Sequence, residues 1–219
     1  MRIGAKICGI SSQAAMAAAV GGGARLVGLV FYPPSPRALS PLAAAKLARG
    51  VPGHVGKVGL FVDPEDGAIA EVVAAVPLDL LQLHGAESPA RVRELRQRFG
   101  LPIIKAIKIA EGPDLDAAGP YLDAADWLLF DARPPSTMTA ALPGGNALSF
   151  DWSLLAGRSW PKPWLLAGGI DRENVAEAVA LSGATMVDVS SGVEDAPGRK
   201  SVEMIVAFLD AVAAIDPGP

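Results

Sequence analysis

The sequence predicts a single-domain α/β fold, a (β/α)8 TIM barrel that occupies residues 1–219. Eight short apolar runs recur at roughly even spacing, segments of helical period lie between them, and the composition does not break along the chain. Eight is the number at which parallel strands alternating with helices close into a barrel. The competing fold is an open doubly wound sheet. It is disfavoured because CGISSQ, not G-x-G-x-x-G, stands at the end of the first strand.

The eight predicted strands are short, mainly aliphatic runs. In order they are RIGAKIC (2–8), RLVGLVF (25–31), HVGKVGLFV (54–62), LDLLQLH (78–84), PIIKAI (102–107), DWLLFD (126–131), PWLLAGG (163–169) and ATMVDVS (184–190). About eight helices are expected between and after them. Two sets with helical spacing are Val92, Leu95 and Phe99, and Val202, Ile205, Val206 and Leu209. Helix starts are marked by Ser11 or Ser12, Ser40-Pro41, Ser88-Pro89 and Asp171.

The composition indicates a globular protein in a reducing compartment. Hydrophobic residues make up 51% of the chain and charged residues 19%, which is enough to bury a large core. The net charge of -4 gives no electrostatic reason to bind nucleic acid or an anionic membrane. AAMAAAVGGGA resembles a signal segment, but polar residues interrupt it and no membrane span follows. With a single cysteine no internal disulfide forms, so we expect a cytoplasmic protein.

Polar side chains are predicted to meet where the strands end. Strand alternation places Lys6 with Cys8, Gln82 with His84, and Asp188 with Ser190. Asp63 and Asp131 end two further strands at the same level. In a TIM barrel this end carries the chemistry.

Each of these residues also has a purely structural interpretation. A lone cysteine is often a small buried hydrophobe, and His84 could simply close its strand. An aspartate after a strand often caps a turn, which is favoured for Asp63 and is as plausible as catalysis for Asp131. Two histidines and one cysteine are too few for a zinc site. Convergence on one rim favours a functional site.

Three late glycine-bearing loops predict a phosphate site: PGGNA (143–147), LAGGID (166–171) and SSGVE (190–194). Glycines let the backbone approach an anion, and barrels often bind phosphate in the loops after strands seven and eight. We therefore expect a phosphorylated small-molecule substrate. No Walker motif or metal cluster is apparent, so neither a cofactor nor a metal is expected.

The motifs KICGI, GLVFYPPSPR, VGLFVD, LQLHGAE, FDARPP, PGGNALSFDW, LAGGIDRENV and VDVSSGVEDAPGRKS appear in order and span residues 6–201. In these motifs the chain closely resembles the phosphoribosylanthranilate isomerase family of tryptophan biosynthesis. The resemblance implies an enzyme that converts N-(5-phosphoribosyl)anthranilate into 1-(2-carboxyphenylamino)-1-deoxyribulose 5-phosphate. This is an Amadori-type aldose-ketose isomerisation.

The resemblance also implies roles for individual residues. It makes Cys8 the general base and Asp131 the general acid, and it assigns the anthranilate carboxylate to Arg37. His84 and Asp188 belong to the substrate pocket. The phosphate end comprises Gly144, Gly145, Gly168, Gly169, Ser191 and Gly192. Two positions depart from the family pattern: Ala147 replaces a usual glycine, and Ser201 replaces a usual acidic residue. The loop from Ala132 to Ser149 is longer than in compact members, and we expect it to be functional or mobile.

The chemistry sets requirements on the two proposed catalytic groups. An acid must protonate the ring oxygen and a base must remove the C2 proton. We expect the pKa of Asp131 to be raised by burial or by a neighbouring carboxylate such as Asp188. Lys6 is placed either to help form the Cys8 thiolate or to neutralise carboxylates inside the barrel.

Two other functions stay open at this point. One is another phosphosugar isomerase or epimerase barrel, including an aminoaldose isomerase of histidine synthesis. The other is a non-catalytic barrel that holds a phosphometabolite or a partner enzyme. The sequence is compatible with a monomer or a homodimer.

Overall fold

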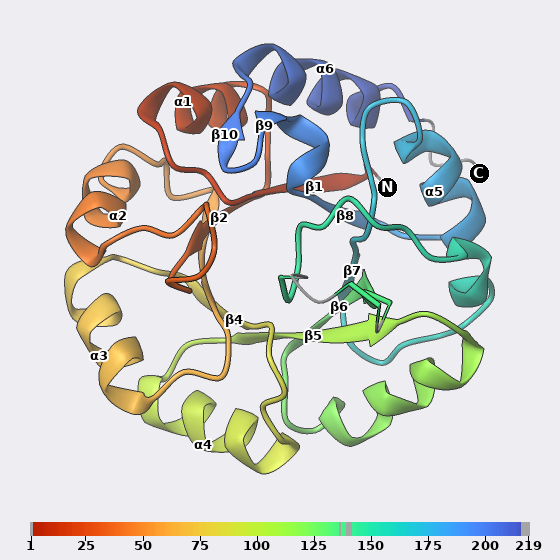
Figure 1. The fold of residues 1–219 in the computed structure, drawn as a ribbon, viewed down its shortest axis with the longest axis horizontal. Helices are drawn as coiled ribbons and strands as arrows, with labels where there is room; N and C mark the ends of the chain where they lie inside the picture. Colours follow the sequence, from red (N-terminus) through yellow and green to blue (C-terminus); the bar gives the residue numbers. More distant parts are fainter. Residues whose placement is uncertain (1, 136, 139–141, 216–219) are drawn as a thin grey trace.

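The computed structural model describes residues 2–135, 137–138 and 142–215, and its centre is a closed barrel of eight parallel strands (Figure 1). The predicted TIM barrel is confirmed. The strands lie in chain order around the barrel, and β1 pairs with β8 to close it. They are β1 (Gly4–Cys8), β2 (Leu26–Val30), β3 (Gly56–Phe61), β4 (Leu80–Leu83), β5 (Ile103–Ile109), β6 (Trp127–Ala132), β7 (Trp164–Leu166) and β8 (Met186–Val189).

Helices form the outer ring seen in Figure 1. The α-helices are α1 (Gln13–Gly21), α2 (Pro41–Ala48), α3 (Asp66–Ala75), α4 (Pro89–Phe99), α5 (Val175–Ser182) and α6 (Val202–Ala213). The connections after β5 and β6 use the 3-10 helices η1 (Gly112–Tyr121) and η2 (Trp152–Leu155) in place of α-helices, so the prediction of about eight helices is met with two of them of the 3-10 type. Pro120 lies inside η1 and removes a backbone donor that a continuous α-helix would need there.

Most of the predicted helix starts are confirmed. Ser12, Ser40 and Ser88 are N-caps whose side chains accept hydrogen bonds from the first turn of α1, α2 and α4. Asp171 lies one turn too early, because α5 begins at Val175. Its carboxylate instead accepts backbone hydrogen bonds within the turn before that helix.

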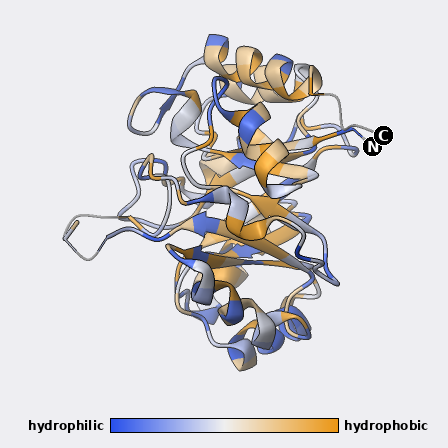
Figure 2. Cartoon of the chain, turned by 90° about the vertical axis from the view of Figure 1, so that its right-hand side faces the viewer, coloured by the Kyte–Doolittle hydropathy of each residue, from blue (hydrophilic) through white to orange (hydrophobic). Residues whose placement is uncertain are grey.

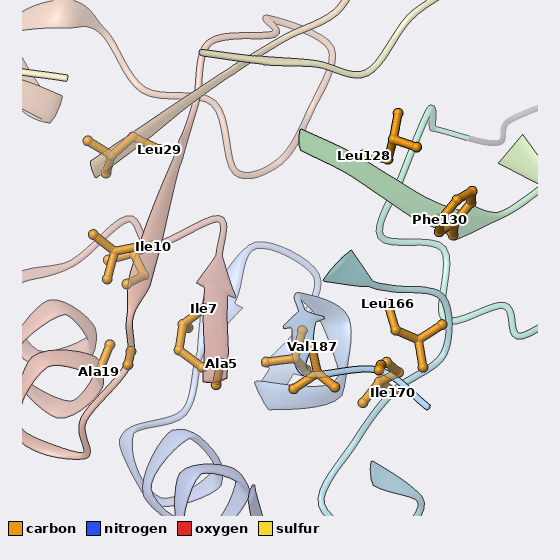
Figure 3. Close-up of a cluster of buried hydrophobic side chains, with 14 of the residues drawn as sticks. Ala5, Ile7, Ile10, Ala19, Leu29, Leu128, Phe130, Leu166, Ile170 and Val187 are labelled. Atoms are coloured by element: carbon orange, nitrogen blue, oxygen red, sulfur yellow. The ribbon is translucent and has the colours of Figure 1, made fainter. Parts of the chain in front are cut away.

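The core has two layers. The outer layer lies between strands and helices, and Figure 3 shows part of it, with Ile7, Leu29, Phe130 and Val187 among the buried side chains. The inner layer fills the barrel with Leu26, Val58, Leu80, Ile104, Ala106, Leu129, Leu165, Ala167 and Met186. Figure 2 shows hydrophobic strands through the middle of the molecule. The strands thus bury both faces, as parallel strands do.

The helix predicted from the spacing of Val202, Ile205, Val206 and Leu209 is confirmed as α6. Its buried face consists of Ile205, Phe208, Leu209 and Val212, whereas Val202 and Val206 are 37% and 41% exposed.

A small hairpin separates the barrel from its last helix. After β8 the chain forms the 3-10 turn η3 (Ser191–Val193) and the antiparallel strands β9 (Glu194–Ala196) and β10 (Arg199–Lys200), then enters α6. None of the helices in the described ranges is both long and apolar enough to cross a membrane. One domain over residues 1–219 stays a prediction, because residues 1, 136, 139–141 and 216–219 lie outside the described residues.

Candidate active site

The strand ends open into one pocket that collects most of the predicted site residues. Figure 1 shows the segment between β6 and β7 reaching over the middle of the barrel, and its residues 142–148 line this pocket. The predicted residues that line it are Cys8, Arg37, His84, Asp131, Gly144, Gly145, Gly168, Gly169, Asp188 and Ser191. Gly192 and Asp63 are not among the lining residues.

Asp63 has the structural role favoured from the sequence. Its carboxylate accepts a hydrogen bond from Ala86 N at 2.7 Å, and it lies so close to Gly85 that a Cβ there would come within 2.5 Å of it. Asp63 adopts φ 44, a left-handed conformation that aspartate tolerates better than most residues. It therefore shapes the loop after β4.

Cys8 ends β1 beside a buried ion pair. Lys6 Nζ donates to Asp188 Oδ1 at 2.7 Å, across the β1–β8 pairing in which Lys6 and Asp188 are Cα partners. A Cβ placed on Gly28 would lie 2.9 Å from Cys8 Sγ and 3.3 Å from Lys6 Nζ, so glycine makes room for both groups. Lys6 thus neutralises a carboxylate inside the barrel and also adjoins the thiol.

The electrostatic balance at Cys8 favours the protonated thiol. Burial raises the pKa of Cys8, and although Lys6 acts in the opposite direction, the net pKa is raised. Burial lowers the pKa of Lys6, but Asp188 outweighs it and holds the pKa above its ordinary value. The ammonium therefore stays charged beside a thiol that is neutral in the ligand-free protein.

Asp131, at the end of β6, is held as a carboxylate by two neighbours. Its Oδ2 lies 3.0 Å from His84 Nε2 and accepts from Lys108 Nζ at 2.8 Å, while Oδ1 accepts from Ala132 N at 3.0 Å. Burial raises the pKa of Asp131, but Lys108 and His84 outweigh it, so the pKa is strongly lowered. The expected raised pKa of Asp131 is therefore wrong for the ligand-free protein.

His84 is fixed at both ring nitrogens. Gln82 Nε2 lies 2.8 Å from Nδ1, and Lys108 Nζ lies 2.7 Å from Nε2. Burial and the Lys108 charge lower the pKa of His84, so the imidazole is neutral at pH 7. Lys108 also donates to Pro143 O and thereby connects Asp131 to the glycine segment above it.

Arg37 lies across the pocket in a second charged cluster. Its guanidinium donates to Glu194 from Nε at 2.7 Å and from Nη2 at 2.8 Å, and Nη2 also donates to Gly145 O at 3.2 Å. Lys200 Nζ donates to the same glutamate at 2.6 Å. Burial raises the pKa of Glu194, but Arg37 and Lys200 outweigh it and lower the pKa.

The glycines predicted for the phosphate end divide into three sets by position: Gly168 with Gly169, Gly144 with Gly145, and Gly192. Gly168 and Gly169 have φ 86 and 67, and their backbones pack against Ala132 and the 148–149 segment. Gly144 lies against His84 and Asp131, and Gly145 lies against the Arg37 guanidinium. Gly192 lets η3 approach the loop after β7, since a Cβ there would lie 2.2 Å from Ile170 O.

The two departures from the family pattern have local consequences. Ala147 adopts φ 55, the left-handed conformation that a glycine would adopt without strain. Ser201 is the N-cap of α6 and accepts from Met204 N at 3.2 Å.

Lys108, Glu194 and Lys200 are site residues that the sequence analysis missed. Lys108 could have been found, because strand alternation puts it on the same inward face as Ile104 and Ala106. The predicted strand stopped at residue 107, one position too early. Glu194 and Lys200 lie in the short hairpin after the last barrel strand, where no strand was predicted.

Known proteins resemble this chain along nearly its whole length. The family model described as N-(5'-phosphoribosyl)anthranilate (PRA) isomerase matches residues 5–211. The N-(5'-phosphoribosyl)anthranilate isomerase of Paramagnetospirillum magneticum is 57% identical over 211 residues, which cover 96% of this chain and 97% of the relative.

Solved structures agree with that similarity. One phosphoribosyl anthranilate isomerase, in complex with reduced 1-(o-carboxyphenylamino)-1-deoxyribulose 5-phosphate, is 34% identical with a TM-score of 0.82. Another structure, of monomers generated from the dimeric enzyme of Thermotoga maritima, is 33% identical with a TM-score of 0.82. Each alignment covers 96% of this chain and 98% of the other.

Proposed function

The chain belongs to the N-(5'-phosphoribosyl)anthranilate isomerase family and is an isomerase of tryptophan biosynthesis, and on that premise we propose that Cys8 and Asp131 perform its proton transfers. The observation that carries the proposal is their placement: a thiol from β1 and a carboxyl group from β6 line one pocket. The reaction needs one acid and one base, and these two groups supply them.

The reaction proceeds in two proton transfers. Asp131, once protonated, gives its proton to the furanose ring oxygen, so the C1–O bond breaks and an iminium ion forms. Cys8, as thiolate, removes the proton from C2, and the electron pair of that C–H bond neutralises the iminium. The resulting enolamine tautomerises to the 1-deoxyribulose ketone. Atoms and charge balance without a redox partner.

The charge states of Asp131 and Cys8 place a condition on this mechanism. Asp131 is ionised because Lys108 and His84 face it, and Cys8 is protonated because it is buried. Substrate must therefore change both groups, and the 24% exposed Lys108 side chain is the partner of Asp131 that has room to move. A proton passed to Asp131 and one withdrawn from Cys8 would convert the resting pair into the active pair.

Binding groups surround the two proposed catalytic residues. Arg37 offers a planar guanidinium to the anthranilate carboxylate. Gly168, Gly169 and Ser191 offer backbone donors and a hydroxyl to the phosphate. His84 and Asp188 contact the reacting sugar. Gly144 and Gly145 cover the sugar ring and the anthranilate carboxylate of the substrate. Gly192 packs against the loop after β7, which carries Gly168 and Gly169.

The test is turnover of freshly prepared N-(5-phosphoribosyl)anthranilate, followed by loss of its fluorescence. Cys8→Ala and Asp131→Asn are each expected to lower kcat by at least about a thousandfold. Both variants should bind reduced 1-(o-carboxyphenylamino)-1-deoxyribulose 5-phosphate with near-native affinity, which controls for folding. Substantial turnover by Cys8→Ala would remove the thiol from the mechanism. Binding without turnover by the unaltered protein would favour a non-catalytic barrel.

Other features of the protein's setting stay predictions. These are its cytoplasmic location, the choice between monomer and homodimer, and the lack of nucleic-acid and membrane partners. One solved relative is described as dimeric. Light scattering of the purified chain would decide its own state.

A further inference from the structure

Glu194, the first residue of β9, accepts four hydrogen bonds although it touches neither Cys8 nor Asp131. Oε1 accepts from Arg37 Nε at 2.7 Å and from Lys200 Nζ at 2.6 Å. Oε2 accepts from Arg37 Nη2 at 2.8 Å and from Gly198 N at 3.2 Å. The contact between Glu194 and Arg37 is therefore bidentate, and this geometry fixes the plane of the guanidinium.

The cluster formed by Arg37, Glu194 and Lys200 carries one positive charge in excess. The three side chains are 5%, 3% and 1% exposed, so water does little to screen that charge. The Lys200 ammonium has three acceptors, namely Glu194 Oε1, Ser190 O and Ser190 Oγ, which match its three hydrogens. The excess charge therefore belongs on the side of Arg37 that Glu194 leaves free.

That free side is Nη1. Within the part of the chain that the structure describes, Glu194 and Gly145 O take hydrogens of Nε and Nη2, and Nη1 has no hydrogen-bond partner. A Cβ on Gly145 would lie 2.6 Å from Nη1, so this edge faces the glycine segment of the pocket. A carboxylate in the pocket would complete the charge balance.

The hairpin that carries Glu194 is packed directly on the segment before Arg37. A Cβ on Gly198 would lie 2.5 Å from Pro36 O, and Gly198 has φ 80, so the turn between β9 and β10 needs glycine for both reasons. Backbone contact and carboxylate contact thus hold Arg37 from the same side.

We propose that Glu194 is a positioning residue for the substrate carboxylate. It fixes the Arg37 guanidinium with Nη1 toward the pocket, and Lys200 neutralises the charge of Glu194. The inference rests on the proposed function, because Arg37 matters only if a carboxylated substrate binds. It adds that recognition of the carboxylate depends on a residue 157 positions away from Arg37.

The experiment compares two ligands by calorimetry: the reduced carboxyphenylamino deoxyribulose phosphate and the same compound without its carboxyl group. The unaltered protein should prefer the carboxylated ligand by about tenfold or more. Glu194→Gln should lower that preference at least about fivefold and change affinity for the carboxyl-free ligand less than about twofold. Glu194→Asp, which keeps the charge but shortens the side chain, should also lower the preference.

Further comparisons separate the possible outcomes. In an Arg37→Met background, Glu194→Gln should leave the preference unchanged, because no guanidinium remains to be positioned. If Glu194→Gln prefers the carboxylated ligand as strongly as the unaltered protein or more strongly, the proposal is overturned. The net charge of the cluster, made more positive by the loss of the glutamate charge, would then matter more for binding than the orientation of Arg37. Weaker binding of both ligands alike would also overturn it, as that result indicates only structural damage. No preference in the unaltered protein would instead refute the proposed function.

Discussion

Lys108 Nζ lies 2.8 Å from Asp131 Oδ2, so a cation faces the proposed general acid before substrate binds. The charged or titratable groups in contact with Asp131 are Lys108 from β5 and His84, which directly follows β4, and Asp188 from β8 influences His84. The first two favour the carboxylate form. The resting site is therefore arranged against the protonation state that the reaction needs from Asp131.

Lys108→Met should raise the pKa of Asp131, because it removes the Lys108 charge, the largest single influence that lowers this pKa. The lowered pKa of Asp131 also makes the free energy of unfolding depend on pH. A lowered carboxyl pKa contributes stability above the unfolded value of about 4, and this is lost as the pH falls through the folded pKa. Lys108→Met should therefore gain less free energy of unfolding than the unaltered protein as the pH rises from the folded pKa of Asp131 to above its unfolded value. Carboxyl NMR titration of Asp131 measures the shift, and Lys108→Arg, which keeps the cation, is the control. An Asp131 titration identical in both variants would contradict the assignment.

Lys6→Met should raise the pKa of Cys8 further, because Lys6 is the nearest group that favours the thiolate. It should also lower the free energy of unfolding by about 3–5 kcal/mol, since Asp188 is left buried without its partner. Thiolate absorbance and denaturant unfolding measure the two effects. The double variant Lys6→Met/Asp188→Asn should recover part of the lost stability. An unchanged thiol pKa would show that Lys6 serves only Asp188.

Ser201→Ala should lower the free energy of unfolding by about 1 kcal/mol, because α6 loses the side-chain acceptor for Met204 N. Ser201→Asp restores the acidic residue usual in the family, and it should stay within about 0.5 kcal/mol of the unaltered protein because aspartate also caps. Urea unfolding of the three proteins tests this. Equal losses in both variants would mean that the serine contributes through something other than the cap.

Ala147→Gly should leave the free energy of unfolding unchanged or raise it by up to about 1 kcal/mol, because glycine relieves the left-handed strain while adding freedom to the unfolded chain. Ala156, which is exposed and has φ -57, provides the matched control. Ala156→Gly should lower the free energy by about 0.5–1 kcal/mol. Thermal unfolding compares them, and similar losses at both positions would show that Ala147 is unstrained.

The barrel fold and most of the residues that line its pocket could be predicted from local sequence patterns. Period-two alternation placed Lys6, Cys8, His84 and Asp188 near the strand ends, and Asp131 was predicted to end a further strand. All of these except Lys6 line the pocket. Such patterns depend only on each strand's own residues, so they are readable before the fold is known.

The charge state of Asp131 was not predictable in the same way. It depends on Lys108 and His84, which reach the carboxylate from two other strands. The same holds for the Arg37–Glu194 contact, which joins residues far apart in the chain and lies outside any repeating pattern. The absence of an α-helix at η1, by contrast, could have been anticipated from Pro120 in its interior.

The pairing of β1 with β8 has a consequence for synthesis of the chain. The first strand of the barrel is completed by the eighth, and Lys6 meets its counter-ion 182 residues further along the chain. Until Met186–Val189 emerges, one edge of β1 has no partner strand and the thiol of Cys8 has no barrel around it. A chain that lacks β8 is therefore open to misassembly along that edge of β1 and to oxidation at Cys8.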